Sequence, residues 1–268
     1  MELICENLNV VDPLMAPALT ALQAEPIIEL VESAVRQGIR IFDLNVGSHV
    51  RKAPRLMEFL LNEVFTSFSD LAVCLDTTNA DALSTGLSLA SRQRRPVMVN
   101  VLSLETEKWP QVVPLLRKHE ESQVVLLLMT PQVPRGAEDR LVAALDGCER
   151  LVQAGISLDR LIIDPVVAPL GWDDGHLHSG EILKFLTLLP EALSQPVKTM
   201  VGLSNITTRS AGRTVRQEVE VVFLSMLAAL GLDYAMINVR HRSLLRTARL
   251  IESFQGREIF SPASLDSA

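Results

Sequence analysis

Short apolar runs alternate with longer segments of helical periodicity along the whole chain. Each run is rich in Leu, Val and Ile, which is typical of a strand buried on both faces of a parallel sheet. The clearest run reads LIIDPVVAP, where branched residues lead to Asp164 and Pro165 then ends the regular ladder. The predicted strands are Glu2–Leu8, Ile39–Val46, Leu71–Thr77, Pro96–Leu102, Gln123–Met129, Leu161–Pro169, Lys198–Asn205 and Tyr234–Val239.

Between these runs, apolar residues recur at the spacing of one helix face. The predicted helices are Glu25–Arg36, Pro54–Phe68, Ala80–Ala90, Glu107–Lys118, Glu138–Gln153, Glu181–Leu193, Val215–Leu230 and Ser243–Phe254. Strict alternation over 268 residues, with no break in composition, favours one closed barrel over an open sheet, because such barrels need roughly 250 residues. The sequence therefore predicts an α/β fold, a single-domain (β/α)8 TIM barrel over residues 1–268.

Charge and cysteine usage narrow the functional classes. The net charge of −7 and the absence of a basic stripe argue against a nucleic-acid partner. No apolar run approaches the ~20 residues of a membrane helix, and the N-terminus MELICENLNV does not resemble a secretory signal. Cys5, Cys74 and Cys148 are odd in number and widely spaced, which indicates a reducing, cytoplasmic location.

Four polar residues follow apolar strands and are the main candidates for a site: Asp76, Asn100, Asp164 and Asn205. In a TIM barrel the carboxyl ends of the strands form the active face, so these side chains are expected to converge. Any one of them alone could equally be a helix N-cap. Pro165 and Gly202 also shape two of these turns, which favours a shared site. Two carboxylates and two amides suit a neutral heteroaromatic ring that carries N–H donors and a carbonyl.

Other residues give weaker signals. His176 and His178, near Asp173 and Asp174, match no standard metal-ligand spacing, so this segment is predicted to be a flexible surface loop and no metal site is expected. Among the remaining histidines, His49 and His241 are expected at the barrel mouth and His119 on a helix surface.

The predicted helix Val215–Leu230 has a wider apolar arc than a surface helix needs. One side is expected to cover the barrel, and the other is a candidate homodimer interface.

Several short motifs together resemble those of the pterin-binding barrel family, and specifically of methyltetrahydrofolate:corrinoid methyltransferases. They are ENLN (6–9), FDLNVG (42–47), CLDTTN (74–79), MVN (98–100), IDP (163–165) and GLSN (202–205), in the family's order along the barrel. The chain departs from the family at Asn7, where arginine is usual, at Val101–Leu102 and in the segment MTPQVPRG after the fifth strand.

The resemblance implies roles for matching positions. Catalysis would fall to Asn205, which approaches the methyl-bearing ring nitrogen, together with Asp164. The substrate-binding residues would be Asp76, Asn100 and Asp164 at the ring edge, Asn9, Asp43 and Asn45 at the pocket floor, Gly202 and Asn205 on the seventh strand, and Arg213 near the outer end of the substrate.

The reaction implied is methyl transfer between 5-methyltetrahydrofolate and the cobalt of a corrinoid (cobalamin) carried by a partner protein. A carboxamide is not an acid near neutral pH, so the proton would arrive through water while Asn205 holds the protonated nitrogen. One alternative is dihydropteroate synthase, although its GxSRK segment is absent and Asn238, Arg240 and His241 are shifted from its Arg-x-His pair. A non-catalytic barrel subunit that docks a corrinoid protein is the other.

Overall fold

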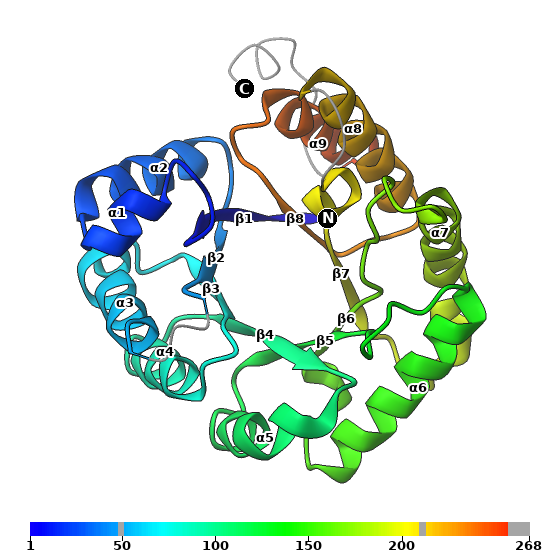
Figure 1. Cartoon of the computed structure of the whole chain (residues 1–268), viewed down its shortest axis with the longest axis horizontal. Helices are drawn as coiled ribbons and strands as arrows, with labels where there is room; N and C mark the ends of the chain where they lie inside the picture. Colours follow the sequence, from blue (N-terminus) through cyan, green and yellow to red (C-terminus); the bar gives the residue numbers. More distant parts are fainter. Residues whose placement is uncertain (48–50, 209–212, 257–268) are drawn as a thin grey trace.

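The computed structural model describes residues 1–47, 51–208 and 213–256. Eight parallel strands close into a barrel in sequence order, and helices form a ring around them (Figure 1). The strands are β1 (Glu2–Asn9), β2 (Ile41–Asn45), β3 (Ala72–Asp76), β4 (Val97–Ser103), β5 (Gln123–Leu127), β6 (Leu161–Asp164), β7 (Lys198–Gly202) and β8 (Tyr234–Ile237). The predicted (β/α)8 TIM barrel is therefore confirmed.

The outer layer consists of α-helices connected to the strands by short turns. They are α1 (Ala16–Ala21), α2 (Ala24–Arg36), α3 (Ala53–Phe59), α4 (Ala80–Arg92), α5 (Trp109–Lys118), α6 (Ala137–Gln153), α7 (Gly175–Ala192), α8 (Arg213–Ala229) and α9 (Arg242–Phe254). Shorter helical turns are η1 (Leu60–Val64), η2 (Phe65–Ser67), η3 (Thr106–Lys108), η4 (Leu158–Arg160) and η5 (Leu203–Thr207). None of the helices in the described ranges is long and apolar enough to span a membrane.

The barrel interior is filled below its carboxyl end. Its interior cluster consists of Ile4, Ile41, Cys74, Met98, Val125, Ile162, Met200, Tyr234 and Met236. A second, larger apolar cluster lies between the strands and the helices. Because side chains alternate along a strand, the inward residue that follows each member of the interior cluster lies at the barrel mouth.

The predicted helix 54–68 is interrupted. The α-helix ends at Phe59 and continues as the π turn η1 and the 3-10 turn η2. Buried Arg95 donates to the carbonyl oxygens of Phe65, Phe68 and Leu71, and so holds the end of this interrupted helix against the start of β3. This tertiary contact is not visible in the local sequence.

The prediction of a flexible surface loop around His176 and His178 is wrong. Helix α7 begins at Gly175, six residues before the predicted start at Glu181, and His178 is only 3% exposed. Its Nδ1 accepts a hydrogen bond from Arg140 at 3.2 Å. A Cβ on Gly175 would lie 2.2 Å from the Pro169 carbonyl oxygen, so glycine permits the close approach of this helix to the preceding loop.

Two further predictions are corrected. His119 lies at the C-cap of α5 and is buried, because Ser122 and Arg160 donate to its carbonyl and hold the chain inward. The sequence predicted no helix before Glu25, yet Ala16–Ala21 forms α1 with Pro17 in the first turn, where no N–H is needed. His49 lies outside the described residues.

Arg140 fixes the loop that follows β6. Its side chain is fully buried and donates to the carbonyl oxygens of Pro165, Arg135 and Gly136 at 3.1, 2.9 and 3.3 Å. One guanidinium thus ties the start of α6 to the residue directly after Asp164.

We expect Arg140→Met to lower the free energy of unfolding by about 3 kcal/mol, because the buried carbonyls lose their donors. Urea unfolding at pH 7 measures the change. Arg135→Met is the matched control: its side chain is 84% exposed and its contact with Asp174 is a surface pair, so it should change stability by less than about 1 kcal/mol. Equal losses in the two variants would contradict this role for Arg140.

Candidate active site

Acidic side chains gather at the barrel mouth. Each lies two residues beyond a member of the interior cluster and therefore faces inward: Glu6 after Ile4, Asp43 after Ile41, Asp76 after Cys74 and Asp164 after Ile162. We call Glu6, Asp43, Asp76 and Asp164 the four mouth acids. Asn100 occupies the corresponding position on β4, two residues after Met98.

Two strand irregularities occur at this level. The pairing register of β1 with β2 shifts between Cys5 and Leu8, and that of β4 with β5 shifts between Asn100 and Leu102. Such bulges re-aim neighbouring side chains and are common beside active sites. The second bulge contains Val101, one of the positions where the sequence departs from the family.

Asp76 is oriented by its neighbour on β2. Asn45 Nδ2 donates to Asp76 Oδ2 at 2.8 Å, while Asn45 Oδ1 accepts from the backbone N–H of Gly47. Burial raises the pKa of Asp76 to about 6, against the lowering effect of the Asn45 bond. Asn45 therefore holds the Asp76 carboxyl in place at the barrel mouth.

Asp43 and Asn100 each present a buried oxygen that has no hydrogen-bond partner among the described residues, Oδ1 in both cases. Burial, and then the negative charge of Asp76, raise the pKa of Asp43 well above its usual value. Burial therefore favours the neutral form of the Asp43 carboxyl. Because unpaired buried oxygens are costly, these two atoms are suited to accept or exchange hydrogen bonds with a bound polar ligand.

Asp164 ends β6 and is 5% exposed. Its Oδ1 accepts from the N–H of Val166 at 2.8 Å, and burial raises the pKa of its carboxyl to about 7. Val166 has φ +60°, a left-handed conformation that is rare and costly for a β-branched residue. The contact of Arg140 with Pro165 and the contact of Asp164 with Val166 together hold this strained turn.

Asn205 lies on η5, directly after β7, and its side chain is exposed. Its Nδ2 lies 3.0 Å from the position that a Cβ on Gly202 would occupy. The glycine at the end of β7 therefore lets the carboxamide fold back over the strand end.

Glu6 was not selected from the sequence as a site residue. Ser204 Oγ donates to its Oε2 at 2.8 Å, and burial raises the pKa of Glu6 to about 7 despite this bond. The alternation of side chains along β1 could have identified Glu6, because Glu2, Ile4 and Glu6 share one face of the strand. The sequence prediction selected only Asp and Asn residues at the ends of strands. The bulge after Cys5 could not be predicted from local sequence.

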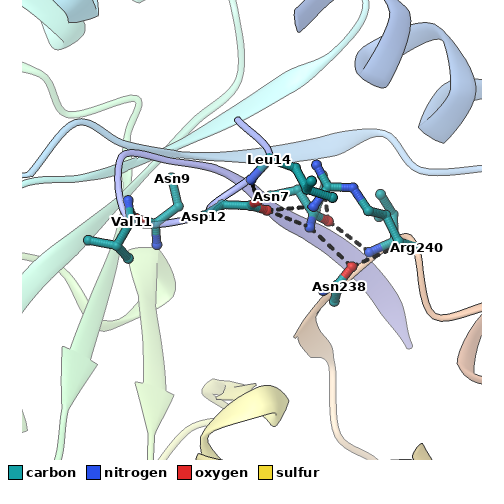
Figure 2. Close-up of polar contacts among 9 residues, drawn as sticks. Asn7, Asn9, Val11, Asp12, Leu14, Asn238 and Arg240 are labelled. Carbon is teal, nitrogen blue, oxygen red and sulfur yellow. Dashed lines mark hydrogen bonds and ion pairs between the residues drawn. The ribbon is translucent and has the colours of Figure 1, made fainter. Parts of the chain in front are cut away.

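Asn9 and Arg213 contribute less to the described geometry. Asn9 Oδ1 accepts from the N–H of Val11, so this end of β1 is capped locally (Figure 2). Arg213 is the first residue of α8, and its side chain lies outside the structural description.

Asn7, which stands where the family usually has arginine, joins β1 to the end of β8. Figure 2 shows its Nδ2 directed at Asp12 and Asn238, both at 3.1 Å. Arg240 donates to Asp12 Oδ2 at 2.6 Å. A guanidinium thus reaches this region from the loop after β8 rather than from β1.

His241, predicted at the barrel mouth, is 5% exposed at the start of α9. Its Nδ1 lies 3.0 Å from Glu220 Oε2, and Glu220 Oε1 accepts from the Thr207 hydroxyl at 2.6 Å. This chain of contacts anchors η5, and hence Asn205, to α8 and α9.

No group of three or more His, Cys, Asp or Glu side chains that could hold a metal ion occurs within residues 1–47, 51–208 and 213–256.

Stability should fall as pH rises from about 4 to 7. Unfolded carboxyls have pKa values near 4, whereas the folded pKa values of Asp76, Glu6 and Asp164 are about 6, 7 and 7, so the folded state holds more protons in this window. Each group lowers the free energy of unfolding by about 1.4 kcal/mol per pH unit between its two pKa values.

Urea unfolding at several pH values compares the wild type with Asp164→Asn. The free energy of unfolding of Asp164→Asn should fall less steeply with pH, because the contribution of the Asp164 carboxyl is removed. Glu29→Gln, a change at an exposed position of α2, is the control and should keep the wild-type slope. An unchanged slope in Asp164→Asn would show that this carboxyl is ionised in the folded protein.

Solved structures with a similar fold include dihydropteroate synthases. The enzyme from Yersinia pestis with a pterine-sulfa conjugate has a TM-score of 0.68 and 16% identity, covering 95% of this chain and 94% of that chain. The enzyme from Thermus thermophilus has a TM-score of 0.66 and 19% identity, covering 96% and 94%. The enzyme from Xanthomonas albilineans with 4-aminobenzoic acid has a TM-score of 0.64 and 16% identity, covering 96% and 93%. At these identities the likeness shows the fold alone.

A family model described as "Pterin binding enzyme" matches residues 5–238, which extend from β1 to the end of β8. This match includes the segments with Asp76, Asn100, Asp164 and Asn205. It confirms the resemblance to pterin-binding barrels inferred from the short motifs. The chain therefore belongs to the pterin-binding enzyme family.

Proposed function

We propose that this protein is a methyltransferase that moves a methyl group between 5-methyltetrahydrofolate and the cobalt of a corrinoid protein. The observation that carries the proposal is the combination at the mouth of buried, unpartnered oxygens on Asp43 and Asn100 with an asparagine on the turn after β7. The first feature supports a pterin ring, and the second supports chemistry at a ring nitrogen.

The pterin edge would lie against β3, β4 and β6. Asp76 and Asp164 would accept hydrogen bonds from ring N–H groups, and the Asn100 carboxamide could both accept and donate. Asn45 would hold Asp76 in position. A ring with several donors would relieve the cost of burying these oxygens, which favours a heteroaromatic substrate over an apolar one.

Methyl transfer requires the ring nitrogen to become a better leaving group. If that nitrogen is protonated, the pair of electrons on cobalt(I) forms the new Co–C bond while the C–N electrons return to nitrogen, which keeps its proton. Asn205 would stabilise the protonated nitrogen through its carbonyl oxygen, and Asp164 would join the hydrogen-bond chain.

The runner-up is a dihydropteroate synthase, which the fold neighbours favour. The distribution of lysines argues against it. On β7, Lys198 lies at the opposite end of the barrel and donates to Tyr234 Oη at 2.8 Å, while GLSN stands at the mouth without a lysine.

Calorimetric titration with 5-methyltetrahydrofolate tests the pocket. We expect binding by the wild type and a loss of about 10-fold to 100-fold in Asp164→Ala, because charge-assisted hydrogen bonds are removed. Asp173→Ala, an exposed acid on the same loop, should bind as the wild type does. Binding of a pterin pyrophosphate instead would support the synthase, and binding of neither would support a non-catalytic docking subunit.

Asn205→Ala tests the chemistry. Methyl transfer to cobalt(I) cobalamin should slow by about 100-fold or more, while the dissociation constant for 5-methyltetrahydrofolate changes by less than about threefold, because the amide acts mainly on the protonated state. An unchanged rate would rule out this role for Asn205.

We also propose that α8 forms a homodimer interface. Its exposed apolar residues are spaced along one helix face: Val215, Val222, Met226 and, just after the helix, Leu230. Val222→Lys should convert a dimer to a monomer in light-scattering measurements. Val142→Lys, at an exposed valine on α6, is the control and should leave the mass unchanged. A monomeric wild type would contradict the interface.

A further inference from the structure

Two cavities meet at the seam between the ends of β7, β8 and β1. Their volumes are about 520 and 540 Å³, and Glu6, Ser204, Asn238 and Arg240 line both. Among the four mouth acids, Glu6 is the one that lines these cavities, and it also faces the barrel interior. Its side chain therefore stands between water-accessible space and the mouth.

Glu6 is coupled to the turn that presents Asn205. Ser204 Oγ donates to Glu6 Oε2 at 2.8 Å, and Ser204 immediately precedes Asn205 on η5. Asp76, Asn100 and Asp164 lie on β3, β4 and β6, whereas Glu6 and Ser204 lie on the β7 to β1 side of the mouth. A ring held at its edge by the first group would direct its far side toward the second.

We propose that Glu6 is the acid that delivers the proton to the methyl-bearing ring nitrogen, and that water in the adjoining cavities returns a proton to Glu6 after each turnover. The proposal rests on the methyltransferase function proposed above and identifies the proton donor that the Asn205 carboxamide cannot be.

The charges around Glu6 favour its protonated form. Burial raises its pKa to about 7, the Ser204 bond lowers it, and the charges of Glu220 and Asp12 raise it. Arg240, a cation that lines both cavities, donates to Asp12. The titratable or charged groups around Glu6 are Asp12 from the loop after β1, Asp43 from β2, Arg216 and Glu220 from α8, and Arg240 and His241 after β8.

Asp164 is less suited to exchange protons with solvent. It is 5% exposed, and its Oδ1 is held by the Val166 N–H. Glu6 has a carboxyl that can give up a proton near neutral pH, and it also lines a cavity. A general acid that must be reprotonated after each turnover requires both properties.

The proposed step balances. The Glu6 carboxylic acid gives its proton to the ring nitrogen and becomes a carboxylate. Cobalt(I) then takes the methyl group with its own electron pair, and the C–N electrons stay on the nitrogen, which leaves as the N–H of tetrahydrofolate. Water in the cavities reprotonates Glu6, so one solvent proton is consumed for each methyl group transferred.

The test is single-turnover methyl transfer from 5-methyltetrahydrofolate to cobalt(I) cobalamin between pH 5.5 and 8.5, with the full chain. The wild-type rate should fall as pH rises through about 7, where Glu6 loses its proton. Glu6→Gln should slow transfer by about 30-fold or more and remove this pH limb, with the dissociation constant for the folate within about threefold.

Two controls accompany Glu6→Gln. Glu2→Gln changes an exposed glutamate on the same strand at the other end of the barrel and should keep the wild-type rate and pH profile. Ser204→Ala keeps the acid and removes its hydroxyl partner, so it should shift the pH limb upward and retain it. A Glu6→Gln rate within threefold of wild type, with the pH limb intact, would overturn the proposal.

Calorimetry separates failure of this proposal from failure of the proposed function. Binding enthalpies of 5-methyltetrahydrofolate in two buffers of different ionisation enthalpy give the number of protons taken up. At pH 7 the wild type should take up more protons than Glu6→Gln, even if transfer to cobalamin proves absent. Equal proton uptake would overturn the role of Glu6, and no binding to the wild type would overturn both proposals.

Discussion

Burial of carboxyl groups that have no ion-pair partner among the described residues is the constraint on which the site depends. Glu6, Asp43, Asp76 and Asp164 point into the same end of the barrel, and burial is the largest cause of the raised pKa of each. A charged carboxylate in this environment is expensive, so part of the set keeps its protons. The partners that limit this cost are small and neutral, such as the Asn45 amide, the Ser204 hydroxyl and the Val166 N–H. The mouth thus combines hydrogen-bond acceptors with carboxyl groups that favour their protonated form.

Two buried arginines and one half-buried arginine stabilise the scaffold instead of neutralising the mouth. Arg95, Arg140 and Arg160 donate to backbone carbonyls of turns outside the strands. Arg140 holds Pro165 directly after β6, and Arg160, directly before β6, holds the turn between α5 and β5. Within the described part of the chain, these cations bind backbone carbonyls and the four mouth acids form no ion pair. That arrangement suits a neutral ring with several N–H groups better than an anionic substrate.

The spacing of apolar residues predicted most of the fold, and the polar residues at the ends of strands predicted part of the site. Apolar runs identified all eight strands, because parallel barrel strands are buried on both faces. Asp76 and Asp164 were found because they end strands. Glu6 was missed because its orientation depends on strand parity and on a bulge, and the start of α7 was missed because the contact of His178 with Arg140 is made only in the folded chain. Asn9 was included by motif alone, and its described contact is a local turn. These differences come from tertiary contacts that local sequence does not encode.

The interior cluster closes the barrel beneath the mouth, and the hydrogen bond between Lys198 and Tyr234 lies at its far end. Among the described residues, the packed interior therefore leaves the mouth open only at the carboxyl end of the barrel. Under the proposed function, the flat ring and the large second reactant would use the same opening. The small molecule would then arrive before the larger one covers it, and would depart only after the larger one has moved away. One-sided access thus imposes an order on encounter and release, without requiring any moving part in the barrel itself.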